Sequence, residues 1–178
     1  HKRGVKSMKE IRLLNPDDLE EVYQLFKEAT SDPKNIYTWA IYDEDKVCRE
    51  YFKKLIDANN NAQYLFGVFF NNELVGALTL FHPIIVGTQH KAIIENMYVK
   101  DIDHLDEKLL NTVADFCTEL QIEKIMAPVA SNNISALTFY SEYGFSKIGF
   151  ETNSRKYGDE YIDEHWLIYP IKKAADVN

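Results

Sequence analysis

Two hydrophobic periodicities divide the 178-residue chain into predicted strands and helices. Alternating or continuous apolar runs predict strands at 9–15, 62–70, 73–82, 91–99 and 122–129, and two closing strands follow residue 144. Apolar residues at helical spacing predict helices over roughly 17–30, 43–58, 104–120 and 131–144. The order β-α-α-β-β-β-α-β-α-β-β predicts an α/β fold, in which a mixed sheet carries helices on both faces.

Polar residues mark several of these boundaries. Asn71-Asn72 separates two β-rich runs and predicts a two-residue hairpin turn. Asn15 or Asp17 can cap the first helix, because both residue types accept hydrogen bonds from the first-turn amides. Three consecutive asparagines at 59–61 predict the end of the second helix.

Composition and charge narrow the class of protein. Hydrophobic residues make up 46% and charged residues 27%, so we expect a single domain over residues 8–171, with 1–7 and 172–178 as tails. A net charge of −8 and a pI near 5.1 argue against nucleic acid or an anionic membrane as partner. The longest apolar run, 64–70, is too short to cross a bilayer, and the N-terminus lacks an apolar signal segment. A cytoplasmic protein is therefore predicted.

Neither the cysteines nor the histidines are spaced like metal ligands. Cys48 and Cys117 lie far apart without a CxxC motif, in segments predicted to be helical. His82, His90 and His165 show no ligand spacing. We therefore expect no metal site and no disulfide framework.

The segment 131–145 contains the most specific motif of the chain. It follows a predicted strand directly and reads N-x-x-A-x-x-F-Y-x-x-x-G-F. Together with the strands predicted at 73–82 and 91–99, it resembles the GNAT superfamily of N-acyltransferases over about residues 9–170. The resemblance implies a mostly antiparallel central sheet and acetyl-CoA as co-substrate. The motif residues are Asn133, Ala136, Phe139, Tyr140, Gly144 and Phe145.

The resemblance gives these residues roles. Asn133 would cap its helix or bind the pantetheine arm, Ala136 would leave room for the coenzyme, and Phe139 would lie beside it. Tyr140, one helical turn beyond Ala136, would protonate the leaving thiolate, which suits a phenol with a pKa near 10. The alternative is that Phe139 and Tyr140 are core aromatics.

The predicted strand 91–99 would supply the other side of the site. In the family this strand separates from its neighbour at a bulge, and its backbone pairs with pantetheine. By this resemblance Met97, Tyr98 and Val99 bind the coenzyme. Glu95 would act as general base, directly or through water; alternatively it is a structural or solvated strand residue.

The segment after Val99 departs from the family pattern. Its glycine-rich phosphate loop is replaced by KDIDHLDEK, which contains neither glycine nor arginine. Its four carboxylates oppose phosphate binding, which Lys100, His104 and Lys108 can partly offset. Asp103 and Asp106 are expected to be the cap and a first-turn acid of the next helix.

Three functions follow from these features. The motif favours an acetyl-CoA-dependent N-acetyltransferase acting on a small-molecule or peptide amine. The acidic loop instead favours a catalytically silent ligand- or protein-binding module. A homodimer built on the closing strands is the third, with Tyr161, Trp166 and Tyr169 at its interface. The predicted acceptor-side residues, which would suit a protonated amine, are Tyr37, Trp39, Asp43, Glu44, Asp45, Asp159, Glu160, Asp163 and Glu164.

Overall fold

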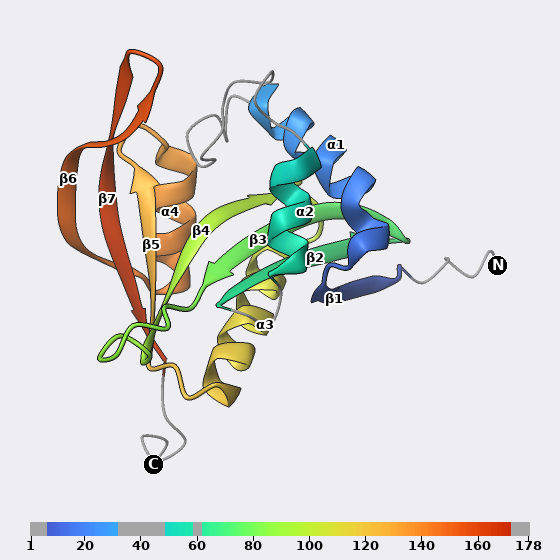
Figure 1. Cartoon of the computed structure of the whole chain (residues 1–178), viewed down its shortest axis with the longest axis horizontal. Helices are drawn as coiled ribbons and strands as arrows, with labels where there is room; N and C mark the ends of the chain where they lie inside the picture. Colours follow the sequence, from blue (N-terminus) through green and yellow to red (C-terminus); the bar gives the residue numbers. More distant parts are fainter. Residues whose placement is uncertain (1–6, 32–48, 59–61, 172–178) are drawn as a thin grey trace.

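The computed structural model describes residues 7–31, 49–58 and 62–171, and these form one seven-stranded sheet with helices on both faces (Figure 1). The strand order is β1-β2-β3-β4-β5-β7-β6, and only β4 and β5 run parallel. The predicted mixed, mostly antiparallel α/β fold is therefore confirmed. The elements are β1 (Lys9–Leu13), the 3-10 helix η1 (Pro16–Asp18), α1 (Leu19–Ser31), α2 (Arg49–Asp57), β2 (Gln63–Phe70), β3 (Glu73–Phe81), β4 (Lys91–Val99), α3 (Leu105–Glu119), β5 (Lys124–Ala130), α4 (Ile134–Tyr143), β6 (Ser146–Tyr157) and β7 (Glu160–Pro170).

These bounds agree closely with the hydrophobic pattern. β4 spans the predicted range, and α2 ends just before the three asparagines. Positions 43–48 of the predicted second helix lie outside the described residues. Among the helices that the structure describes, none has the length and apolar character needed to cross a membrane.

Each face of the sheet packs against two helices. α1 and α2 cover one face and contact each other through Phe26 and Phe52, whose rings stack with centroids 5.2 Å apart. α3 and α4 cover the other face, where Leu109, Leu110 and Tyr140 are buried against strand residues. The two hydrophobic clusters hold the sheet rigidly between its helices.

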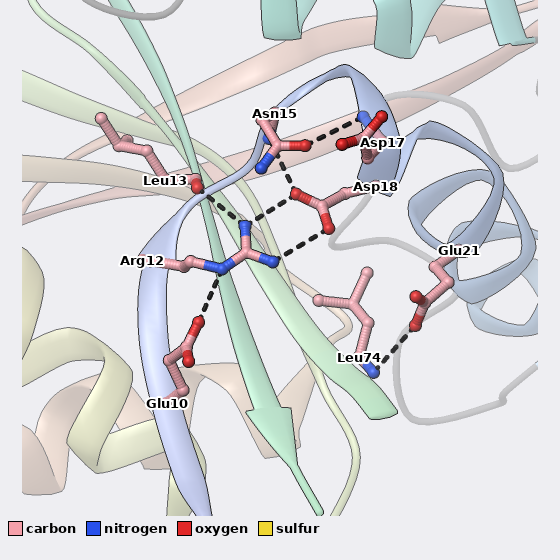
Figure 2. Close-up of polar contacts among 8 residues, drawn as sticks. All are labelled: Glu10, Arg12, Leu13, Asn15, Asp17, Asp18, Glu21 and Leu74. Carbon is pink, nitrogen blue, oxygen red and sulfur yellow. Dashed lines mark hydrogen bonds and ion pairs between the residues drawn. The ribbon is translucent and has the colours of Figure 1, made fainter. Parts of the chain in front are cut away.

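A polar cluster fixes the turn between β1 and α1 (Figure 2). The Oδ1 of Asn15 accepts a hydrogen bond from the Asp17 amide at 2.9 Å. Asn15, one of the two predicted caps, is therefore the N-cap of η1. The Asp18 carboxylate accepts from the Asn15 amide at 2.8 Å and from both Arg12 Nη atoms at 2.7 and 3.0 Å. The Arg12 guanidinium lowers the pKa of Asp18, because it stabilises the ionised carboxylate.

Asp18→Asn is expected to lower the free energy of unfolding at pH 7 by about 1–3 kcal/mol, since a charge-assisted pair is lost. The folded-state pKa of Asp18 lies below its ordinary value of 3.8. Its contribution is therefore present above that value and disappears as the pH falls through the folded-state pKa. Urea unfolding at pH 7 and in acid measures the difference. Asp17→Asn is the matched exposed control. If both variants lose the same free energy of unfolding, or if the loss in Asp18→Asn does not depend on pH, the stabilising role of the Asp18–Arg12 pair is contradicted.

β4 contains a β-bulge at Glu95. Asn96 pairs with Thr79 of β3 and Ile94 pairs with Leu80, so Glu95 is the extra residue between two regular pairs. The bulge reverses the alternation of side chains along the strand. Ile94 consequently belongs to the cluster under α3 and α4, whereas Asn96 lies on the α1–α2 side.

β4 and β5 pair only at one end. Residues 91–93 pair with 124–126, and the two strands then diverge, as Figure 1 shows. Pro128 lies in the part of β5 that has left β4, and a proline lacks the amide that a central strand uses in its ladder. The divergence opens the middle of the sheet.

Candidate active site

The divergence leaves one edge of β4 without a β5 ladder partner from residue 94 onward. Met97, Tyr98 and Val99, the predicted pantetheine-binding residues, all lie in this stretch. The side chains of Met97 and Val99 pack on the α3–α4 side, but the Tyr98 ring is buried with α1 and α2. Only the backbone of Tyr98 can therefore line the opening.

Asn133 caps α4 with its side-chain oxygen, and its side-chain nitrogen is unpaired among the described residues. Its Oδ1 accepts from the Ala136 amide at 3.1 Å, which confirms the predicted cap. Its Nδ2 is buried and has no hydrogen-bond partner in the described part of the chain. Buried polar atoms normally have partners, so this donor has unused hydrogen-bonding capacity. Ala136, in the first turn of the same helix, is half-buried.

Tyr140 connects α4 to the open part of β4. The residue is 5% exposed, and its hydroxyl donates to the Met97 Sδ at 3.5 Å. Its ring packs against Phe139 and Phe145, with centroids 5.4 and 4.9 Å away. Burial raises the pKa of Tyr140, so the phenol carries its proton at neutral pH. A thioether is a weak acceptor, and the hydroxyl can turn to a better partner at little cost.

Glu95 belongs to an ionic chain that crosses the opening. Its Oε2 lies 3.4 Å from Nη2 of Arg155 on β6, and Nε of Arg155 donates to Glu164 of β7 at 3.1 Å. Glu164 is 3% exposed and also accepts from the Ser154 hydroxyl at 2.5 Å. The sequence did not indicate Arg155, because it lies 60 positions from Glu95, just after a register shift in β6.

The β4–α3 loop turns through two left-handed residues, Asp103 with φ 49° and His104 with φ 55°. These non-glycine residues adopt the left-handed conformation that glycine supplies at least cost. His104, not Asp103, is the N-cap residue of α3, and it makes no side-chain capping bond. The predicted capping role of Asp103 is therefore wrong, because its carboxylate is bound elsewhere. Asp106 is a first-turn acid, as expected.

Two lysines share the Asp103 carboxylate. Lys9 of β1 forms a short ion pair with it, and the Nζ of Lys108 lies 3.7 Å from the same oxygen. The neighbouring Lys9 side chain lowers the pKa of Lys108. Lys100, which the sequence offered as a compensating charge, instead pairs with Glu28 at 3.1 Å. Two lysines therefore face the single Asp103 carboxylate, and Lys9 is a contributor that the sequence did not indicate.

A cavity of about 420 Å³ lies between α3 and α4, next to this loop. Leu105 is buried in the core, so it does not fill the cavity. Tyr143 donates to Oδ1 of Asn111 at 2.7 Å, and burial raises the pKa of Tyr143 to about 12. Three carboxylates give the cavity an acidic wall. The lining residues are His104, Asp106, Glu107, Asn111, Phe139, Glu142, Tyr143 and Tyr169.

A second cavity of about 460 Å³ lies beneath α2 and reaches Glu95. Asn96 donates from Nδ2 to the Tyr51 hydroxyl at 3.3 Å, and burial raises the pKa of Tyr51. The Thr79 hydroxyl is buried without a hydrogen-bond partner among the described residues. The lining residues are Tyr51, Lys54, Leu55, Gln63, Thr79, Phe81, Glu95 and Asn96.

Several predicted acceptor-side residues have other roles. Asp163 accepts from the Asn153 amide at 2.7 Å, and Glu164 binds Arg155, so neither is a free surface charge. Tyr169, predicted at a dimer interface and not on the acceptor side, packs against Phe145 with ring centroids 5.3 Å apart. The predicted residues at 37, 39 and 43–45 lie outside the described residues.

Cys117 is the cysteine that the structure describes. Cys117 is buried, and burial raises its thiol pKa to about 12, whereas Cys48 lies outside the described residues. In the described ranges, no three His, Cys, Asp or Glu side chains come together as a metal-binding group.

The chain belongs to the GNAT acetyltransferase family. The acetyltransferase (GNAT) domain matches residues 11–166. A probable acetyltransferase from Staphylococcus epidermidis is 36% identical, with a TM-score of 0.80 over 93% of this chain and 100% of the other. An N-acetyltransferase from Staphylococcus aureus is 27% identical, with a TM-score of 0.72 over 92% and 98% of the two chains.

More distant structures share the fold. A Salmonella typhimurium protein, described as an acetyltransferase with its cofactor acetyl-CoA, has a TM-score of 0.75 and 15% identity over 94% of this chain and 96% of its own. No curated protein matches the sequence. The fold and the family membership predicted from residues 131–145 are thereby confirmed.

Proposed function

We propose that the protein transfers an acetyl group from acetyl-CoA directly to a primary amine, with Tyr140 as general acid. The observation that carries this proposal is the position of the Tyr140 hydroxyl, which contacts Met97 at the unpaired part of β4. Among the described residues the hydroxyl has only the Met97 thioether, a weak acceptor, as its polar partner. A departing thiolate could therefore replace Met97 as the acceptor of this proton.

The residues around the opening fit the coenzyme. The unpaired β4 edge offers backbone groups, and the buried Nδ2 of Asn133 offers a donor that the protein itself does not use. When bound, acetyl-CoA supplies the acetyl group as a thioester. The residues that would hold it are Met97, Tyr98, Val99, Asn133, Ala136, Phe139 and Lys108.

Glu95 is proposed as the general base that takes a proton from the acceptor ammonium. Its place on the bulge brings its carboxylate to the edge of the cavity beneath α2. Arg155 positions that carboxylate from the other half of the sheet. Unpaired β4 amides nearby could polarise the acyl carbonyl.

The acidic wall between α3 and α4 favours a second candidate, a ligand-binding module without transferase activity. Asp106, Glu107 and Glu142 line the cavity nearest the β4–α3 loop. Carboxylates there oppose the phosphates of a coenzyme, although Lys9 and Lys108 offset part of the charge. Coenzyme binding therefore separates the two candidates.

Thermal melting with acetyl-CoA tests the proposal. Binding to the folded protein raises the melting temperature, and at a ligand concentration 100 times Kd the stabilisation is about 2.7 kcal/mol. We expect a shift of several degrees with acetyl-CoA and a smaller one with ADP, because pantetheine pairing needs the whole coenzyme. No shift at millimolar acetyl-CoA would favour the silent module.

Asp106→Asn is expected to tighten acetyl-CoA binding about 10-fold in low salt, since a first-turn carboxylate repels phosphates. The same change should lower stability by about 0.3–1 kcal/mol, because Asp106 complements the helix dipole. Calorimetric titration and urea unfolding report the two effects. Glu119→Gln, in the last turn of α3, is the control and should leave affinity unchanged. Equal affinities for wild type and Asp106→Asn would place the phosphates elsewhere.

A further inference from the structure

We propose that the cavity beneath α2 binds an acceptor amine that carries its own carboxylate, as free amino acids do. The inference rests on the proposed acetyl transfer and adds the chemical class of the acceptor. The cavity reaches Glu95, the proposed base, and its volume of about 460 Å³ suits a small molecule.

The cavity presents one charged group of each sign. Glu95 reaches it from β4, and Lys54 reaches it from α2. The only polar contact of Glu95 among the described residues is the one at 3.4 Å to Arg155, which leaves its Oε1 available to an ammonium. Lys54 forms no ion pair with any residue in the described ranges. A zwitterion satisfies both groups, whereas a diamine would meet repulsion at Lys54.

The cavity is also lined by Thr79, whose buried hydroxyl is unpaired among the described residues. Thr79 is 2% exposed, and its hydroxyl lacks a partner among the described residues. Thr79 lies opposite Asn96 in the β3–β4 register, so two buried polar side chains face the same cavity. A buried hydroxyl without a partner weakens the free protein, and a bound polar ligand can supply the missing hydrogen bond.

A matched substrate panel tests the inference. Initial rates are measured with acetyl-CoA and each of the common L-amino acids, beside the corresponding amino-acid amides and simple diamines. We expect at least one free amino acid to exceed its amide by about 10-fold or more in kcat/KM, which is about 1.4 kcal/mol of discrimination. Amides or diamines that serve as well as the free acids would overturn the inference.

Lys54→Gln should reduce the preference for that free acid over its amide to near unity, chiefly by raising KM for the free acid. Lys53→Gln is the matched control, because Lys53 is an exposed neighbour on the same helix that does not line the cavity. A preference that survives Lys54→Gln, or that falls equally in both variants, would overturn the role of Lys54.

Thr79→Val provides an independent test with effects of opposite sign. Valine has the same branched shape without the hydroxyl, so the melting temperature should rise while KM for the amino acid increases several-fold. An unchanged KM would remove Thr79 from the binding site. An enzyme that acetylates only diamines or peptides would refute the amino-acid acceptor but not the proposed acetyl transfer. A protein that neither binds acetyl-CoA nor acetylates any amine refutes both.

Discussion

Tyr140→Phe is expected to lower kcat about 100-fold or more while leaving the fold and the affinity for acetyl-CoA nearly unchanged. The substitution removes only the hydroxyl, whose one polar partner among the described residues is the Met97 thioether at 3.5 Å. The ring contacts with Phe139 and Phe145 remain, so the core keeps its packing. The measurement is turnover per folded molecule together with acetyl-CoA affinity and melting temperature.

Tyr143→Phe is the matched control on the same helix. That substitution also removes one hydroxyl, which donates to Asn111 in the cavity between α3 and α4. It should cost about 1 kcal/mol of stability and leave kcat largely intact. If Tyr140→Phe instead destabilises the protein and keeps its rate, Tyr140 is a core aromatic without a chemical role.

Arg155→Met is expected to reduce the free energy of unfolding by about 3 kcal/mol or more. Glu164 is 3% exposed, and the substitution leaves its carboxylate buried without a counter-ion. Breaking one partner of a buried ion pair is costly, because the remaining charge has lost both water and its partner. The change also releases Glu95, so turnover should fall as well. Denaturant unfolding and steady-state kinetics measure the two losses.

Two further variants sharpen this experiment. Glu164→Gln combined with Arg155→Met should recover more than half of the lost stability, since no charge is then left unpaired. Lys156→Met, at the next position of β6, changes an exposed cation over the Tyr161 ring and should cost less than about 1 kcal/mol. A loss below 1 kcal/mol for Arg155→Met would show that Glu164 has access to solvent or to another partner.

Most of the fold could be predicted from local periodicity. The hairpin of β2 and β3, the amphipathic helix α3 and the full length of β4 follow from runs of residues that interact within one element. The bulge at Glu95 could not be placed that way, because nothing in the pattern of 91–99 marks an extra residue. The divergence of β4 from β5 was expected only from the family resemblance, although Pro128 is a sequence signal for it.

The residues of the candidate site also fall into those that the sequence indicated and those that it did not. Asn133 and Tyr140 could be proposed from the sequence because one helical segment carries both at fixed spacing. Lys9 and Arg155 were missed because each meets its partner across the sheet, far away in sequence. The left-handed backbone at Asp103 and His104 was missed for a different reason: glycine is the usual signal for that conformation, and here it is absent.

The short pairing between β4 and β5 leaves the two halves of the sheet with few backbone links. In the described part of the chain, the half that contains β1–β4 joins the half that contains β5–β7 by ladder pairing of residues 91–93 with 124–126, beside a hydrogen bond from the Glu123 amide to the His90 carbonyl. Two of the side-chain contacts that bridge the opening are Tyr140 to Met97 and Arg155 to Glu95. The two groups proposed to move protons, Tyr140 and Glu95, therefore also make contacts across the opening. Because both contacts bridge the same opening, a ligand that enters between β4 and β5 is expected to disturb the Tyr140 and Glu95 contacts together.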